Sequence, residues 1–162
     1  MRCTCRHETT TLGVALATTA AAFSMLAPAT AHADEGRVKF SSPSGNIHCV
    51  VDQDGAAPVA LCQLKQITYT VPPGVGRGQT GEPCPGGSGS GNDVRLDVGK
   101  PGFVRCSYAA LDGGVGPWPT LKYGTSASFG VITCDSAPYA VTCTDTSSGH
   151  FFRVSRDFYE FG

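Results

Sequence analysis

Short hydrophobic segments, separated by clusters of Gly, Pro, Ser and Asn, make up most of the chain after residue 33. Residues 37–40 and 93–98 alternate strictly between polar and apolar side chains, which is typical of half-buried strands. The same criteria predict further strands at 47–52, 59–64, 103–107, 127–135, 140–145 and 150–155. After residue 33, no segment has the apolar spacing of a helix of three turns. The pattern therefore predicts an all-β domain, a small antiparallel sandwich or barrel of hairpins stapled by disulfides.

The first predicted hairpin places two cysteines opposite each other. A two-residue turn at Gly55-Ala56 pairs Cys49 with Cys62, and glycine at the first central position suits a type II′ turn. Counting outward from the turn puts the two cysteines at a non-hydrogen-bonded position, where facing side chains lie closest. Pro58 also falls at such a position, where its missing N–H does no harm. The spacing predicts a Cys49–Cys62 disulfide.

A second hairpin repeats this arrangement. A turn centred on residues 138–139 places Cys134 opposite Cys143, again at a non-hydrogen-bonded position. A proline in that turn suits the primed hairpin turns poorly, so a wider loop is the alternative. If these two disulfides form, Cys84 and Cys106 pair by elimination.

Three segments lie outside this simple alternation. Residues 67–71 continue the preceding strand if a bulge or bend at 65–66 shifts the apolar phase. Residues 72–92 are rich in Gly and Pro and are expected to form a flexible loop tied down by a cysteine. At the end of the chain, the sequence DFYEF is expected to form one helical turn with Ser155 as its cap.

Residues 1–33 have the organisation of a secretory signal peptide. A basic start precedes the uncharged, apolar residues 12–28, and small-x-small cleavage sites end at Ala31 and Ala33. The apolar stretch is shorter than the roughly 20 residues that span a bilayer. We therefore expect one exported domain over 34–162, without a transmembrane segment.

Composition supports export and excludes one class of partner. Only 15% of residues are charged, and 12 Lys+Arg nearly balance 13 Asp+Glu, so no basic surface for nucleic acid is expected. The 21 glycines and 11 prolines disfavour long helices. Six of the 8 cysteines lie after residue 33, and an even number in an exported chain indicates disulfides and a secreted, extracytoplasmic location.

Catalytic patterns are weak in this sequence. After residue 33 the histidines are His48 and His150, and no spacing singles out an acid and a nucleophile for either. The cysteines lack the close C-x-x-C pairs of zinc sites, and the glycine-rich loop lacks the G-K-[ST] of a phosphate-binding loop. No metal or cofactor is expected.

Loop residues suggest a binding surface instead. Trp118 lies between Pro117 and Pro119, and rigid aromatic side chains of this kind suit the faces of sugars or protein partners. The alternative is that Trp118 covers one end of a small core. The candidate binding residues are Ser44, Asn46, Trp118, Tyr123, His150 and Arg156. Arg156 would contact an anionic group or form an internal ion pair with an aspartate.

The sequences FSSPSGNIHC at 40–49 and GHFFRVSRDFYEF at 149–161 resemble an uncharacterised family of exported actinobacterial proteins. The pattern of that family opens with S-P-S-G-N-I-x-C and closes with S-R-x-x-Y. The resemblance covers nearly all of the expected mature chain, including its six cysteines. It departs from the pattern at Lys122 and Phe151, where the family has Pro and Gly. The resemblance implies a shared fold and an exported or envelope setting, but no activity.

Together these features favour a non-enzymatic binding or interaction module with an extracellular or envelope partner, either a protein or a glycan. One alternative is a small secreted hydrolase that uses His48 or His150. The other is a disulfide-rich protease inhibitor with residues 72–92 as bait, although the glycines of that loop oppose the rigidity that a good inhibitor needs.

Overall fold

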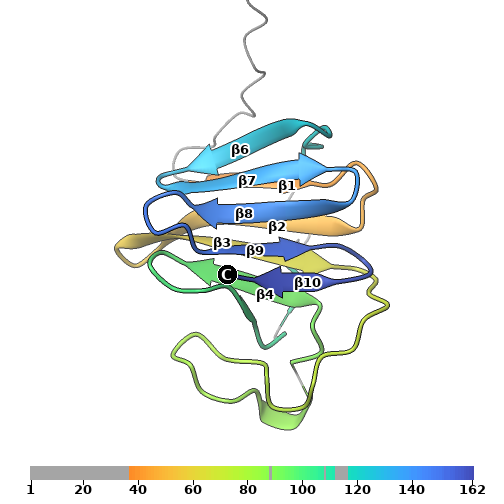
Figure 1. Ribbon diagram of the computed structural model, residues 1–162, viewed down its shortest axis with the longest axis vertical. Helices are drawn as coiled ribbons and strands as arrows, with labels where there is room; N and C mark the ends of the chain where they lie inside the picture. Colours follow the sequence, from red (N-terminus) through yellow and green to blue (C-terminus); the bar gives the residue numbers. More distant parts are fainter. Residues whose placement is uncertain (1–36, 88, 108, 112–116) are drawn as a thin grey trace, which may run out of the picture.

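Two five-stranded antiparallel sheets form the fold in the computed structural model, which describes residues 37–87, 89–107, 109–111 and 117–162 (Figure 1). The first sheet contains, in spatial order, β1 (Arg37–Ser41), β2 (Ile47–Asp54), β3 (Ala57–Leu64), β4 (Asp93–Asp97) and β5 (Phe103–Val104). The second contains β6 (Thr125–Phe129), β7 (Ile132–Ala137), β8 (Ala140–Asp145), β9 (Phe151–Val154) and β10 (Tyr159–Phe161), also in chain order. Each sheet is thus a simple meander, and the all-β prediction is confirmed.

The inward positions of the two sheets form one hydrophobic core. Strand β4 illustrates how alternation produces it, because Val94 and Leu96 are fully buried in the core while Arg95, the residue between them, lies on the other face. Phe40 from the first sheet and Phe152 from the second are the largest fully buried side chains. Burying a large apolar side chain contributes roughly 1.5–3 kcal/mol to the stability of the fold. The two sheets are therefore held together mainly by the side chains on their inner faces.

All three predicted disulfides are present. The strand registers pair Cys49 with Cys62 and Cys134 with Cys143, at Cα–Cα distances of 4.1 and 4.0 Å. Each of these two bonds joins the second and third strands of its sheet. The third bond, Cys84–Cys106, has a Cα–Cα distance of 5.4 Å and ties the long β3–β4 connection to the chain after β5.

Both hairpins that carry disulfides turn as the sequence predicts. In the first, Asp54 pairs with Ala57, so Gly55 and Ala56 form a two-residue turn in which Gly55 has a φ of 65°. In the second, pairing of the residues that flank 138–139 leaves a two-residue turn there, and the wider loop is not formed.

The single strand predicted over 127–135 is wrong, because the chain reverses within it. Phe129 pairs with Ile132, which makes Gly130 and Val131 a tight turn between β6 and β7. Gly130 has a φ of 56°, and a Cβ atom at this position would lie 2.6 Å from Cγ of Pro58. Only glycine satisfies both the left-handed backbone and this close approach.

The helical turn predicted at the end of the chain is also wrong. Ser155 Oγ accepts hydrogen bonds from the amides of Asp157 and Phe158, as a helix cap would. The chain then reverses, and β10 pairs with β9. The side chains that follow become strand residues because Tyr159 and Phe161 pack against the core.

The segment 67–71 belongs to no strand, so the predicted continuation of β3 is wrong. Tyr69 anchors it by donating a hydrogen bond to the Gly91 carbonyl, at 2.7 Å, and by packing its ring 5.1 Å from that of Tyr159. The rest of the connection extends beyond the edge of the first sheet in Figure 1, where the Arg77 amide donates to the Val104 carbonyl.

The predicted signal peptide lies in residues 1–33, outside the described part of the chain. Among the residues that the structure describes, no helix has the length and apolar character needed to cross a bilayer.

Candidate functional site

A cleft of about 640 Å³ opens at one end of the sandwich, where turns from both sheets converge. The β7–β8 and β9–β10 turns that line this end cleft lie at the right-hand end of the sheets in Figure 1. The β1–β2 turn and the residues after β3 form its side on the first sheet, and the β7–β8 and β9–β10 turns form its side on the second. Its lining residues are Ser42, Ser44, Gly45, Asn46, Ile47, Lys65, Gln66, Tyr123, Ala137, Pro138, Tyr139, Ala140, Val141, Ser155, Arg156, Asp157 and Phe158.

The S-P-S-G-N sequence builds the β1–β2 turn through its own side chains. Ser42 Oγ accepts a hydrogen bond from the Ile47 amide at 3.1 Å, and it lies 2.9 Å from the hydroxyl of Ser44. The Asn46 amide donates to the same Ser44 hydroxyl at 3.4 Å. Gly45, with a φ of 69°, allows the reversal. Local hydroxyl contacts therefore shape this turn.

Asn46 joins this turn to the chain that leaves β3. Its Nδ2 donates to the Gln66 carbonyl at 3.0 Å, and its Oδ1 accepts from the Gln66 amide at 2.9 Å. The side-chain amide thus pairs with a backbone peptide as a neighbouring strand would. Asn46, which the sequence predicted as a binding residue, lines the end cleft but has its polar atoms engaged in holding the wall together.

Arg156 and Asp157 form an exposed ion pair in the β9–β10 turn. Arg156 Nε lies 3.0 Å from Asp157 Oδ1, which also accepts from Thr68 Oγ1 at 2.9 Å. Hydrogen bonds from Arg156 and Thr68 lower the pKa of Asp157 below its ordinary value. The backbone amide of Thr68 donates to the Arg156 carbonyl at 2.8 Å, so this turn is fixed to the segment that Asn46 also holds.

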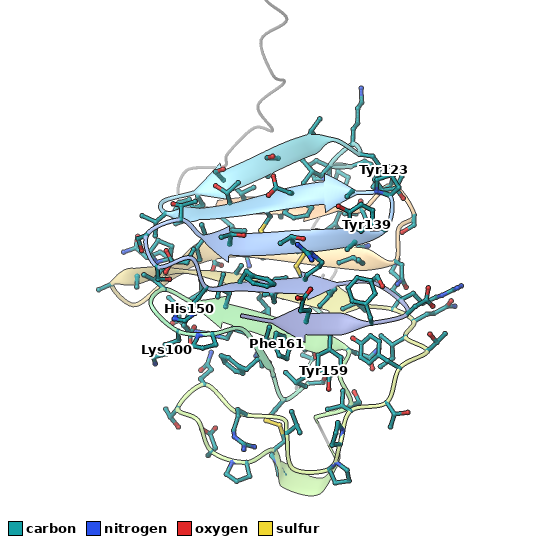
Figure 2. The ribbon with its side chains drawn as sticks, in the orientation of Figure 1. Lys100, Tyr123, Tyr139, His150, Tyr159 and Phe161 are labelled. Carbon is teal, nitrogen blue, oxygen red and sulfur yellow. A yellow bond between two sulfur atoms is a disulfide. The ribbon has the colours of Figure 1, made fainter. Side chains whose placement is uncertain are left out.

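Three exposed aromatic side chains surround the end cleft. Tyr139 is 68% exposed, Tyr123 44% and Phe158 38%, and they are three of the five large hydrophobic residues exposed within the described chain. Figure 2 shows Tyr123 and Tyr139 at the same end of the molecule. Tyr139 occupies the second position of the two-residue turn between β7 and β8.

Sequence reasoning brought only part of this site together. Four of its six candidate binding residues, Ser44, Asn46, Tyr123 and Arg156, line the end cleft. It did not include Tyr139 or Phe158. Tyr139 lies at the centre of a predicted turn but was not among the six, whereas Phe158 was assigned to a helical turn that does not form.

Trp118 lies elsewhere, on the outer side of the first sheet. Its ring stacks on His48 with centroids 4.9 Å apart and an interplanar angle of 22°, and Lys39 Nζ lies 5.8 Å from the ring centre. The Ser41 amide donates to the Pro119 carbonyl, which fixes the Trp118 segment along β1. Trp118 therefore covers the sheet and does not join the end cleft.

His150 lies at the opposite end of the sandwich, near Lys100 in Figure 2. The His150 carbonyl accepts a hydrogen bond from the amide of Asp145. Asp145 is fully buried, and its carboxylate accepts several hydrogen bonds from the loops at that end. Burial raises the pKa of this carboxyl, but donors from Ser147, Ser148 and the Gly99 amide outweigh burial and hold it well below its usual range. The Gly99 contact links the second sheet to the β4–β5 connection.

The end cleft offers stacking surfaces and hydrogen-bonding groups. Its lining contains no histidine or cysteine, and its carboxylate, Asp157, is already paired with Arg156. Nowhere in the described residues do three His, Cys, Asp or Glu side chains gather so that they could hold a metal ion.

Comparison of the chain with protein-family models, with curated proteins and with solved structures finds no match.

Proposed function

We propose that this protein is an exported, non-enzymatic binding module whose end cleft receives a carbohydrate. The observation that carries the proposal is the gathering of Tyr123, Tyr139 and Phe158, all exposed, around one cleft rimmed by polar side chains. Exposed aromatic rings are costly in water unless they meet a partner, and apolar rings beside hydrogen-bonding groups suit the C–H faces and hydroxyls of sugars.

An extracellular or cell-envelope location agrees with this function. Three disulfides form within the described chain, and such bonds persist in oxidising compartments. The apolar stretch at 12–28 supplies the export signal in this proposal. Glycans of an envelope or an extracellular matrix are available in that setting.

The test removes the most exposed ring. Tyr139→Ala should reduce binding to an array of oligosaccharides at least tenfold, because stacking on an aromatic face contributes about 0.5–1.5 kcal/mol beyond its area burial and that area is lost as well. Val131→Ala is the matched control, since Val131 is 37% exposed and occupies a two-residue turn of the second sheet outside the lining of the end cleft. Equal binding by the two variants, or no oligosaccharide bound by the unmodified protein, would contradict the proposal.

The hydrolase and inhibitor alternatives have less support. His48 stacks on Trp118 and His150 lies at the opposite end, so neither histidine lines the end cleft. The bait proposed for an inhibitor, residues 72–92, is tied by the Cys84–Cys106 bond and by the Arg77 amide. Its described residues contain no regular element beyond the short 3-10 helix Pro85–Gly87. A carbohydrate site at the end cleft, in contrast, accounts for the exposed side chains of Tyr123, Tyr139 and Phe158.

A further inference from the structure

The charges around the end cleft differ in sign from those of the whole chain. Its lining contains the cations Lys65 and Arg156 and the single anion Asp157, whereas the sequence as a whole has 12 basic and 13 acidic residues. Asp157 offsets the charge of Arg156, with which it pairs, so the two cations and one anion leave the lining with one net positive charge. The positive charge that remains at the cleft favours an anionic group on the ligand.

Arg156 is arranged to meet such a group. The ion pair with Asp157 engages Nε, and among the described residues Arg156 has no second ion pair. Its side chain is 58% exposed. A guanidinium binds a carboxylate best through two parallel N–H groups, and the contact at Nε leaves its two Nη atoms for that geometry.

The surroundings of Arg156 keep it in place. Its carbonyl accepts from the Thr68 amide at 2.8 Å, and Thr68 Oγ1 orients the Asp157 carboxylate that faces its Nε. Phe158 is two residues further along the same turn and lines the same cleft. A sugar ring that packs on an aromatic residue of the cleft can therefore direct a substituent toward the Arg156 guanidinium. Because the guanidinium is already positioned, binding costs less conformational entropy for this side chain.

We infer that the end cleft selects carboxylated sugars, such as uronic acids, with Arg156 as the contact to the carboxylate. This inference rests on the proposed carbohydrate-binding function and adds the class of ligand. Arg156 is then a specificity-determining residue, and Lys65 adds a second, nearby positive charge.

The experiment compares acidic glycans with their uncharged counterparts, and a variant of Arg156 with a matched variant of Arg153. The unmodified protein is titrated with oligogalacturonides and with their methyl esters, which keep the sugar skeleton and remove the charge, and it is also applied to an array of neutral, carboxylated and sulfated oligosaccharides. Arg156→Gln is the test variant. Arg153→Gln is its control, because Arg153 also forms a 3.0 Å pair with an acid, Glu160, but lies outside the lining of the end cleft.

Carboxylated glycans should bind the unmodified protein more tightly than their neutral counterparts, and Arg156→Gln should weaken them about tenfold to a hundredfold, as expected for a lost charge-assisted hydrogen-bonded pair. Arg153→Gln should leave binding unchanged, and Arg156→Lys should give a smaller loss because it keeps the charge without the fork. Higher salt should weaken the acidic ligands selectively.

Two results would overturn the inference while leaving the proposed function in place. One is a set of bound glycans that is entirely neutral or sulfated. The other is equal affinity of Arg156→Gln and Arg153→Gln for a carboxylated glycan. Binding of no glycan at all would overturn the proposed function together with the inference. Circular dichroism of each oxidised variant establishes that a loss of affinity does not come from unfolding.

Discussion

Replacing Asn46 by alanine should destabilise the domain although the side chain is not buried in the core. The change removes both hydrogen bonds to Gln66, at 3.0 and 2.9 Å, that join the β1–β2 turn to the chain after β3. A net contribution of about 0.5–1.5 kcal/mol for each bond, reduced by their exposure, gives about 1–2 kcal/mol for the pair. For a domain of this size that corresponds to a fall in Tm of about 4–8 °C.

Differential scanning calorimetry of the oxidised proteins measures this difference. Gln53→Ala is the matched control, because Gln53 also donates a side-chain amide hydrogen bond, at 3.2 Å to the Gly55 carbonyl, but only within its own hairpin. It should cost less than about 0.5 kcal/mol. Asn46→Asp keeps the acceptor for the Gln66 amide but loses the donor, so its Tm should also fall. If Asn46→Ala melts within error of Gln53→Ala, Asn46 does not hold the wall of the end cleft.

Two further predictions concern the opposite end of the sandwich. Gly130→Ala should lower the free energy of unfolding, measured by urea titration, by about 1–3 kcal/mol. The φ of 56° is strained for alanine, and its Cβ atom would lie 2.6 Å from Pro58 Cγ. An unchanged urea midpoint would be inconsistent with this turn. Because the pKa of Asp145 is depressed, its stabilising contribution is present above about pH 4, the ordinary aspartate pKa, and is lost as the pH falls below it. Asp145→Asn should therefore lower stability at pH 7 by at least about 1.5 kcal/mol and flatten the loss of stability between pH 5 and 2, and equally steep acid curves for both proteins would refute this role.

Much of the fold follows from local rules that can be applied to the sequence. The hairpin containing Cys49 and Cys62 was predictable because a two-residue turn fixes the register and the register fixes which side chains face each other. The turn at Gly130-Val131 was not predicted because it lies inside an apolar run and only one of its two residues favours turns. Residues Tyr159–Phe161 form a strand because tertiary packing against β9 and the core outweighs the capping signal at Ser155.

The candidate site was harder to predict from the sequence than the fold, because it depends on which turns of the two sheets lie at the same end of the sandwich. Ser44 and Arg156 lie more than a hundred residues apart, and alternation along single strands does not reveal that their turns meet. Trp118 was a reasonable candidate as a rigid loop aromatic, but its contact with His48 depends on how the β5–β6 connection folds back along β1.

The central claim is that the end cleft is the surface that binds carbohydrate. Backbone amide chemical shifts of the ¹⁵N-labelled, oxidised protein, followed during titration with a glycan that it binds, test this claim most directly. Ligand-dependent shifts should be largest at 42–47, 65–66, 137–141 and 155–158, the segments that line the cleft. Shifts concentrated around Trp118 and His48, or at the end that contains His150, would contradict it.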